Sequence, residues 1–295
     1  MDDPALVKMR EEALELFETG QFLPAASSFV NVLLHCPTCT KSSFNLAVIL
    51  QTVHSLATLE GATTTRTAAP AYVAEVFNEL ADSFEEKLVA HLEYRVPWQL
   101  VEALQKLSPA GFVPKDSTMK PDWVVADVGC GTGLCGRLLR PHVDISPLMI
   151  EKTRAEGSYD ELQTADIVPF LESCADESLD LIISADVWIY VGALEKVFEL
   201  SARKLRSSTG WMAFSIELLP PSITKDSEGD ANETSVGFRL APSGRFQHSH
   251  EYITSLASRS GFTVAENQDV SVRKESGEPI PGRIYLLQRA VAQHD

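Results

Sequence analysis

The apolar positions in the first third of the chain recur at intervals of three and four residues, the spacing of amphipathic helices. In residues 5–18 they face a row of glutamates, and in residues 23–35 they continue up to Pro37, which ends the pattern. A third apolar segment spans 44–59, and a further helix pair is predicted within 73–106. This part of the chain is therefore expected to be all-helical.

The first two predicted helices and their ends contain, in this order, Gly20, Phe22, Ala25, Phe29, Val32 and Pro37. This order resembles the second half of a tetratricopeptide repeat. Only one copy is readable, whereas such repeats need about three copies to bury a continuous core. We therefore expect a TPR-like helical hairpin docked on a larger domain, with an independent peptide-binding array as the alternative.

After Pro121 the pattern changes to short apolar runs that alternate with helical segments. Strands are predicted at 123–128, ending at Asp144, ending at Asp166, and at 179–185, 211–217, 262–272 and 283–288, with helices from Leu134, from Ser146, at 192–206 and at 250–260. Such alternation predicts an α/β fold with a doubly wound, mostly parallel sheet. The two consecutive strands at the end predict an antiparallel C-terminal hairpin.

Three segments follow from these patterns. Residues 1–60 form the helical TPR-like segment, 61–72 are a linker of small residues, and 73–295 are the α/β domain. The polar, acidic stretch 220–235 is expected to be a surface loop after the fifth strand.

The charge balance narrows the choice of partners. The 295 residues include 25 Lys and Arg against 41 Asp and Glu, a net charge of −16. An acidic surface repels phosphate backbones, so no nucleic acid is expected as substrate. No segment approaches the roughly 18 to 20 apolar residues of a membrane helix, and no secretory signal is visible at the start. We expect no membrane partner.

The five cysteines are too few and too scattered for a disulfide scaffold, which favours a reducing, cytoplasmic compartment. Cys36 and Cys39 form a CxxC pair at the end of a predicted helix, with only His35 and His54 nearby. A zinc site needs two further ligands at suitable spacing. We therefore interpret the pair as incidental and expect no metal.

The most informative motif is Asp127-Val-Gly-Cys-Gly-Thr-Gly133. Glycines let the backbone pass close to a ligand, and the helix that follows offers unpaired N–H groups. A nicotinamide cofactor or a plain tight turn would look similar. The acid inside the strand end and the strict alternation of Gly129, Gly131 and Gly133 favour the amino-acid carboxylate of S-adenosylmethionine.

With this motif the chain resembles the class I S-adenosylmethionine-dependent methyltransferases over residues 75–295. Further matching segments are 143–149, 159–166 and 180–186, and those typical of the subgroup with N-terminal tetratricopeptide repeats are 92–97, 243–249 and 273–280. The resemblance implies a Rossmann-like enzyme that transfers a methyl group to a small molecule or a protein acceptor. The alternatives are an inactive scaffold that binds a protein partner through its N-terminal helices, and a nicotinamide oxidoreductase.

The resemblance also implies cofactor-binding roles. Asp127 and the three glycines would surround the methionine part, and Asp144 would accept hydrogen bonds from both ribose hydroxyls. Asp166 would accept one from the adenine amino group, with Ile167 packed on the ring. Each acid has a structural alternative, because Asp144 could cap a helix and Asp166 could be a solvated strand end.

Four further residues are expected around the reacting groups. Asp186 and Tyr190 would lie near the transferred methyl, Asp186 as a cofactor contact and Tyr190 on the substrate side. Asp186 could also be a turn residue. Arg95 would pair with the cofactor carboxylate, or with a glutamate of its own helix. Arg245 could hold an acidic group of the substrate.

A general base is needed only when the acceptor must lose a proton, because the leaving group on a sulfonium is already activated. His248 and His250 are the candidates, since they titrate near neutrality just before a late helix. We take His248 as the catalytic candidate. A solvated histidine at a helix start is the structural alternative.

The crossover after the glycine motif is unusually short. Only ten residues, 134–143, separate Gly133 from Asp144, and the gap is longer in the methyltransferases that the chain resembles. A crossover between parallel strands needs at least about 10 to 12 residues, helix included. We therefore predict a truncated helix, with Asp144 still reaching the ribose from a shortened strand and cofactor binding weakened. The alternative is an internal deletion in this segment, with Asp144 out of place.

Overall fold

The structure is a computed structural model. It describes residues 4–19, 21–35, 66–80, 83–107, 123–139, 154, 160–220, 237–275 and 277–291. The predicted helix at 44–59, the CxxC pair, Asp144 with its strand, and nearly all of the predicted loop at 220–235 lie outside the described residues.

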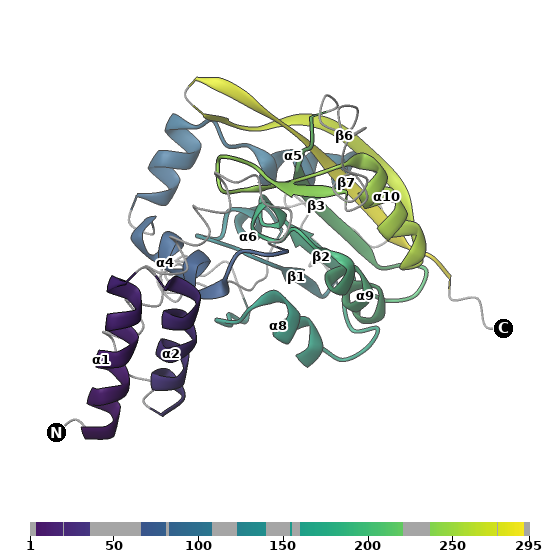
Figure 1. Ribbon diagram of the computed structural model, residues 1–295. Coiled ribbons are helices and arrows are strands. Elements are labelled where there is room, and N and C mark those ends of the chain that lie inside the picture. Colours follow the sequence, from purple (N-terminus) through teal and green to yellow (C-terminus); the bar gives the residue numbers. More distant parts are fainter. Residues whose placement is uncertain are drawn as a thin grey trace, which may run out of the picture.

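Helices precede the sheet. They are α1 (Pro4–Glu18), α2 (Phe22–His35), α4 (Pro70–Leu80), the π-helical η1 (Glu86–His91) and α5 (Val96–Leu107). Helices α1 and α2 pack on one another and lie at one end of the molecule, pointing away from the sheet (Figure 1). Ala13, Ala25, Phe29 and Val32 are buried there. The two helices are confirmed, and their assignment as a tetratricopeptide unit stays a prediction.

The described strands form one mixed sheet. They are β1 (Val125–Asp127), β2 (Leu181–Ser184), β3 (Trp211–Leu218), β4 (Phe238–Leu240), β5 (Phe246–His248), β6 (Phe262–Glu275) and β7 (Glu278–Arg289). Strands β1, β2 and β3 are parallel neighbours, with Asp127 beside Ile183 and Ile183 beside Ala213. Strand β7 runs antiparallel to β3 and to β6. This arrangement confirms the parallel centre and the antiparallel C-terminal hairpin (Figure 1).

Helices cover both faces of this sheet. Those in the α/β region are α6 (Leu134–Leu139), α8 (Ile167–Ser173), the 3₁₀ helix η2 (Trp188–Tyr190), α9 (Glu195–Lys204) and α10 (His250–Arg259). Ile182 and Phe214 pack with α8, α9 and α10, whereas Ile183 and Ala213 pack with α5 and α6. Because neighbouring strand residues point to opposite faces, the apolar runs of the sequence serve both layers.

Two strand predictions differ from the structure. Among the described residues 160–166 only Thr164 takes part in a β-bridge, and no strand reaches Asp166. Oδ1 of Asp166 instead accepts a hydrogen bond of 2.6 Å from the Ile167 amide and caps α8. Strand β7 begins before the predicted start, despite Pro279 and Pro281. Both prolines lie beyond Gly282, where the pairing of β7 with β3 ends, so their missing N–H groups leave no gap in that ladder.

The last part of the predicted linker is anchored to the α/β domain. The amide of Ala68 donates to the Tyr190 carbonyl at 2.9 Å, and the Ala193 amide donates to the Arg66 carbonyl at 2.8 Å. These bonds bring the chain across the segment that follows β2, immediately before α4 begins.

Candidate functional site

A cavity of about 330 Å³ lies at the carboxyl ends of β1 and β2. This is where open α/β sheets bind ligands, and the volume is within the range of small-molecule sites. Its wall is formed by the turn after β1, the segment after β2, the starts of α8 and α9, and residues of α4 and η1. The stretch 66–68, Arg245 and Arg273 complete it.

The glycine turn forms one side of the cavity. Gly129 and Gly131 line it, and their φ angles of +78° and +56° lie in the left-handed region that glycine adopts without strain. A Cβ on Gly129 would collide with Cγ2 of Val187. Gly129 is thus packed against Val187 with no room for a side chain, and the glycine backbone itself forms this part of the cavity wall. Gly133 and the buried Asp127 are not part of the cavity lining.

The start of α8 forms a second side. Asp166 and Ile167 both line the cavity. The capping hydrogen bond from the Ile167 amide fixes the carboxylate at the cavity wall, with the isoleucine side chain beside it. The two predicted contacts to adenine are thus brought together with the glycine turn.

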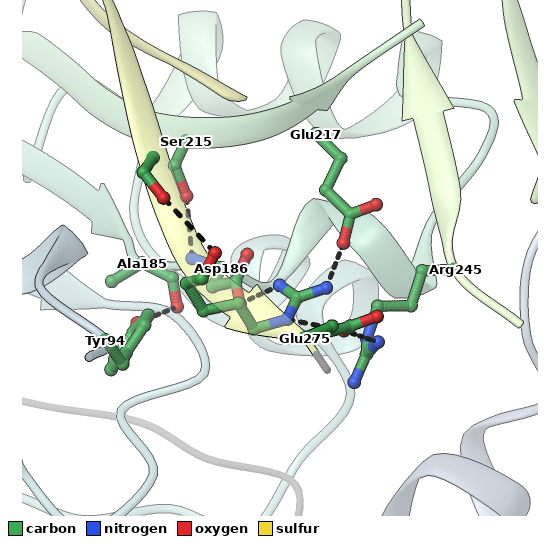
Figure 2. Close-up of polar contacts among 9 residues, drawn as sticks. Tyr94, Ala185, Asp186, Ser215, Glu217, Arg245 and Glu275 are labelled. Carbon is green, nitrogen blue, oxygen red and sulfur yellow. Dashed lines mark hydrogen bonds and ion pairs between the residues drawn. The ribbon is translucent and has the colours of Figure 1, made fainter. Parts of the chain in front are cut away.

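A buried network of charged side chains closes the far side (Figure 2). Asp186 and Arg273 line the cavity, and Nη1 of Arg273 donates to Oδ2 of Asp186 at 2.7 Å. Arg273 also donates to Glu217 through Nη2 and to Oε1 of Glu275 through Nε, the latter at 2.9 Å. Arg245 donates to the same Glu275 carboxylate.

Burial dominates the electrostatics of this network. It raises the pKa of the Asp186 carboxyl, and the positive charge of Arg273 only partly opposes that shift. The pKa of Glu217 is raised for the same reason. Burial alone would lower the pKa of Arg273, but the Asp186 and Glu217 carboxylates raise it, so the guanidinium stays charged.

Asp186 is held in an uncommon backbone conformation. Its φ is 60°, and its amide donates to Oγ of Ser215 at 2.8 Å. Asp and Asn are among the few non-glycine residues that tolerate this region. The turn at the end of β2 thereby directs an acid toward the cavity.

Aromatic rings form the remaining wall, and of these residues the sequence analysis singled out Tyr190 alone as a site residue. The Tyr94 hydroxyl donates to the Ala185 carbonyl at 3.1 Å. The rings of Phe77 and Tyr190 meet edge to face, with 5.4 Å between their centroids, and Phe84 lies next to Phe77. All four line the cavity. Their helices were predicted only from apolar spacing, which does not distinguish core from cavity wall.

Two predicted residues lie apart from the cavity. His248 is fully buried, and its Nε2 lies within hydrogen-bond distance of the Val191 and Gly192 carbonyls, at 3.1 and 2.9 Å. Burial lowers its pKa to about 4, and it does not line the cavity. Its neighbour His250 is placed with Nδ1 at 2.9 Å from the Tyr285 hydroxyl. Arg95 is exposed and does not line the cavity either.

Comparisons with known proteins agree with this geometry. Residues 126–214 match the family model described as a methyltransferase domain. The structure is similar to that of a protein described as "the putative methyltransferase", solved as a complex with the Haloferax volcanii Trm112 methyltransferase activator. The identity is 13%, 76% of this chain and 100% of that chain are covered, and the TM-score is 0.53.

Two other solved structures are S-adenosylmethionine-dependent methyltransferases. That from Thermotoga maritima is 17% identical, covers 73% of this chain and 99% of its own, and has a TM-score of 0.49. That from Mesorhizobium loti is 20% identical, with 64% and 96% covered and a TM-score of 0.44. No curated protein sequence matches the chain.

The fold is therefore that of the methyltransferases, and the predicted cofactor, S-adenosylmethionine, is confirmed at the level of domain and fold. Within the described ranges, none of the helices is long and apolar enough to cross a membrane.

Proposed function

We propose that the protein transfers a methyl group from S-adenosylmethionine to an acceptor bound in the same cavity. One observation carries this proposal. The glycine turn after β1, the Asp166–Ile167 pair and the segment after β2 come from three separate parts of the sequence, and all three line a single cavity.

The residues present fit the cofactor. The backbone at Gly129 and Gly131 would receive its methionine part, and Asp166 with Ile167 its adenine. The cofactor, when bound, supplies an activated methyl group on a sulfonium. The protein then has to bind, orient and exclude water, which supplies much of the rate in such displacements. Tyr94 holds the Ala185 carbonyl, which fixes the backbone of the segment after β2.

The proposal is tested by calorimetric titration with S-adenosylhomocysteine. We expect saturable one-to-one binding by the natural chain and no binding of a nicotinamide dinucleotide. Replacing Gly129→Ala places a Cβ against Val187 in a left-handed residue, which costs about 1–2 kcal/mol for the backbone alone. We expect at least a tenfold loss of affinity.

Gly277→Ala is the matched control. Gly277 has a similar φ, +86°, but a Cβ there meets nothing within 4 Å. This variant should suffer comparable backbone strain and keep its affinity. Binding of the dinucleotide but not of S-adenosylhomocysteine would refute the proposal.

The acceptor itself is a small molecule or a protein side chain. Incubation with methyl-labelled S-adenosylmethionine and cell extract, followed by separation by size, identifies which fraction takes up the label. Cofactor binding without any transfer is the result that a scaffold protein would give.

A further inference from the structure

The charged network beside the cavity is not balanced. Asp186, Glu217 and Glu275 share two guanidinium groups, those of Arg245 and Arg273. Side chains of Glu217 and Arg273 are each 3% exposed and that of Asp186 is 9% exposed, whereas those of Arg245 and Glu275 are 26% and 30% exposed. Among the described residues, solvent therefore screens the outer pair of the network but does little for Asp186. A buried cluster with one carboxylate in excess is costly unless a proton or a cation completes it.

The excess charge has a specific location at the cavity wall. Arg273 occupies only Oδ2 of Asp186; Oδ1 is buried and has no hydrogen-bond partner among the residues that the structure describes. The Asp186 side chain is 9% exposed and lines the cavity. A buried carboxylate oxygen without a partner is rare in a folded protein. Oδ1 has less than 1 Å² of accessible surface, so a donor on a ligand reaches it through a rotation of the Asp186 carboxylate at the cavity wall.

The two arginines at this wall are already engaged by acids. Arg245 donates to Glu275, and Arg273 binds Asp186, Glu217 and Glu275. An anionic acceptor would have to displace these carboxylates. The sequence-based interpretation of Arg245 as a contact for an acidic substrate is therefore less favourable than a contact with a cation.

Aromatic rings line the cavity on the side of α4 and η1. Tyr190 and Phe77 form an edge-to-face pair, and Phe84 continues that wall. The faces of aromatic rings attract cations within about 6 Å by roughly 0.5–2 kcal/mol, more when water is excluded. An acid with a free oxygen and a set of aromatic rings together favour an organic ammonium group.

We propose that the methyl acceptor is a small organic amine, bound as its ammonium ion with an N–H group donating to Oδ1 of Asp186. This inference rests on the proposed methyltransferase function and names the acceptor class of that site. Arg273 is the positioning residue, because it holds the other oxygen of the carboxylate from the far end of β6.

The transfer balances with the groups at hand. The ammonium first loses one proton, which Oδ1 of Asp186 accepts and later releases to water. The freed lone pair on nitrogen forms the bond to the methyl carbon, and the carbon–sulfur bond breaks with its electron pair remaining on sulfur. Burial raises the pKa of Asp186, which makes the carboxylate a better proton acceptor than an exposed one.

The test uses the full chain saturated with S-adenosylhomocysteine and three ligands of matched size: phenethylamine, 2-phenylethanol and 3-phenylpropionate. Calorimetry at pH 7.5 should show the amine binding at least tenfold more tightly than the alcohol and the carboxylate. Asp186→Asn should remove that preference. Glu266→Gln, which removes one negative charge from an exposed position on β6, should keep it.

Stability separates this role from a purely structural one. Asparagine accepts the left-handed backbone of residue 186, and the variant leaves two carboxylates for two guanidinium groups. We expect the Tm of Asp186→Asn without ligand to equal or exceed that of the natural chain. A residue needed only as the partner of Arg273 would lower the Tm when neutralised.

Several outcomes would overturn the inference while leaving the proposed function intact. One is binding of S-adenosylhomocysteine with no preference for the amine, or with none of the three ligands bound. Another is a tenfold loss of S-adenosylhomocysteine affinity in Asp186→Asn, which would assign the acid to the cofactor. A third is a preference for S-adenosylmethionine over S-adenosylhomocysteine that disappears in Asp186→Asn, which would make the sulfonium the missing cation. If S-adenosylhomocysteine does not bind at all, the proposed function itself fails.

Discussion

His248 shows how a titratable residue can serve the fold rather than the chemistry. Its ring is fully buried, and Nε2 is placed to donate to two backbone carbonyls of the segment after η2. Burial lowers its pKa to about 4, so the native ring stays neutral while the unfolded chain takes up a proton below about pH 6.5. Protons are then bound preferentially by the unfolded state, and stability falls as the pH drops from 6.5 toward 4.

We predict that this histidine costs the fold about 2 kcal/mol between pH 7.5 and pH 5. The free energy of unfolding, measured by urea titration, should fall less over this interval in His248→Gln, whose amide can still donate. Methyl transfer, once an acceptor is known, should keep its pH profile in this variant. An equal loss of stability in both proteins, or a flattened pH profile for transfer, would count against a structural role.

At this scale the sequence predicted several of the residues that line the cavity. The glycine motif and the resemblance it supports pointed to Gly129, Gly131, Asp166, Ile167, Asp186 and Tyr190, and Arg245 was named as a substrate contact; all seven line the cavity. Arg273 was not assigned a role, because it reaches Asp186 across 87 residues of sequence through a strand pairing. Which of two histidines points inward also depends on packing, since His248 and His250 are alike in the sequence pattern.

The C-terminal hairpin contributes charged side chains to the site in addition to extending the sheet. Strand β6 extends to Glu275, well beyond the residues that the apolar pattern predicted. Its last part carries Arg273 and Glu275 to the ends of β2 and β3, where Asp186 and Glu217 lie. Polar residues ended the predicted strand too early, because they face the site rather than the apolar core.

The short crossover after the glycine turn is expected to weaken cofactor binding. Helix α6 is described from Leu134 to Leu139, the residues that follow lie outside the described ranges, and the truncated helix stays a prediction. Asp144 lies outside the described residues. We expect weak binding of S-adenosylhomocysteine by the natural chain, and about tenfold tighter binding after insertion of roughly seven residues before His142. The reason is that one charge-assisted ribose contact is worth about 1.5–3 kcal/mol.

Calorimetry on both chains measures this difference, and an insertion of equal length after Gly277, in the turn of the β6–β7 hairpin, controls for the added residues. Tight binding by the natural chain that the insertion before His142 does not improve would show that the short crossover is tolerated.

For the whole molecule, the order of strands and helices was predictable, because apolar residues recur with a different spacing in buried strands and in helices that bury one face. The parallel β1, β2 and β3 came from continuous apolar runs, and helices α9 and α10 from three- and four-residue spacing. The short strands β4 and β5 were not predicted, because three residues are too few to show an alternation of apolar and polar positions. The anchoring of residues 66–69 was not predicted either, since it rests on backbone hydrogen bonds to the segment after β2, which do not depend on the side chains.

Because of this anchoring, removing residues 1–60 and removing residues 1–71 are expected to have different effects. Removing residues 1–60 takes away α1 and α2, and we expect lower solubility that the helices restore when supplied in trans. Removing residues 1–71 also deletes the backbone hydrogen bonds between Arg66 or Ala68 and the segment that holds Tyr190 and Ala193. Each such bond contributes about 0.5–1.5 kcal/mol, so the Tm of the shorter chain should lie roughly 5 °C below that of the longer one.

The shorter chain should also bind S-adenosylhomocysteine more weakly, because Thr67, Ala68 and Pro70 form part of the cavity wall. Thermal unfolding and calorimetry on both truncated chains check these expectations. Equal stability and affinity in the two chains would show that residues 61–71 are only a linker. Unchanged stability and solubility after removal of residues 1–60 would show that the N-terminal helices do not dock on the α/β domain.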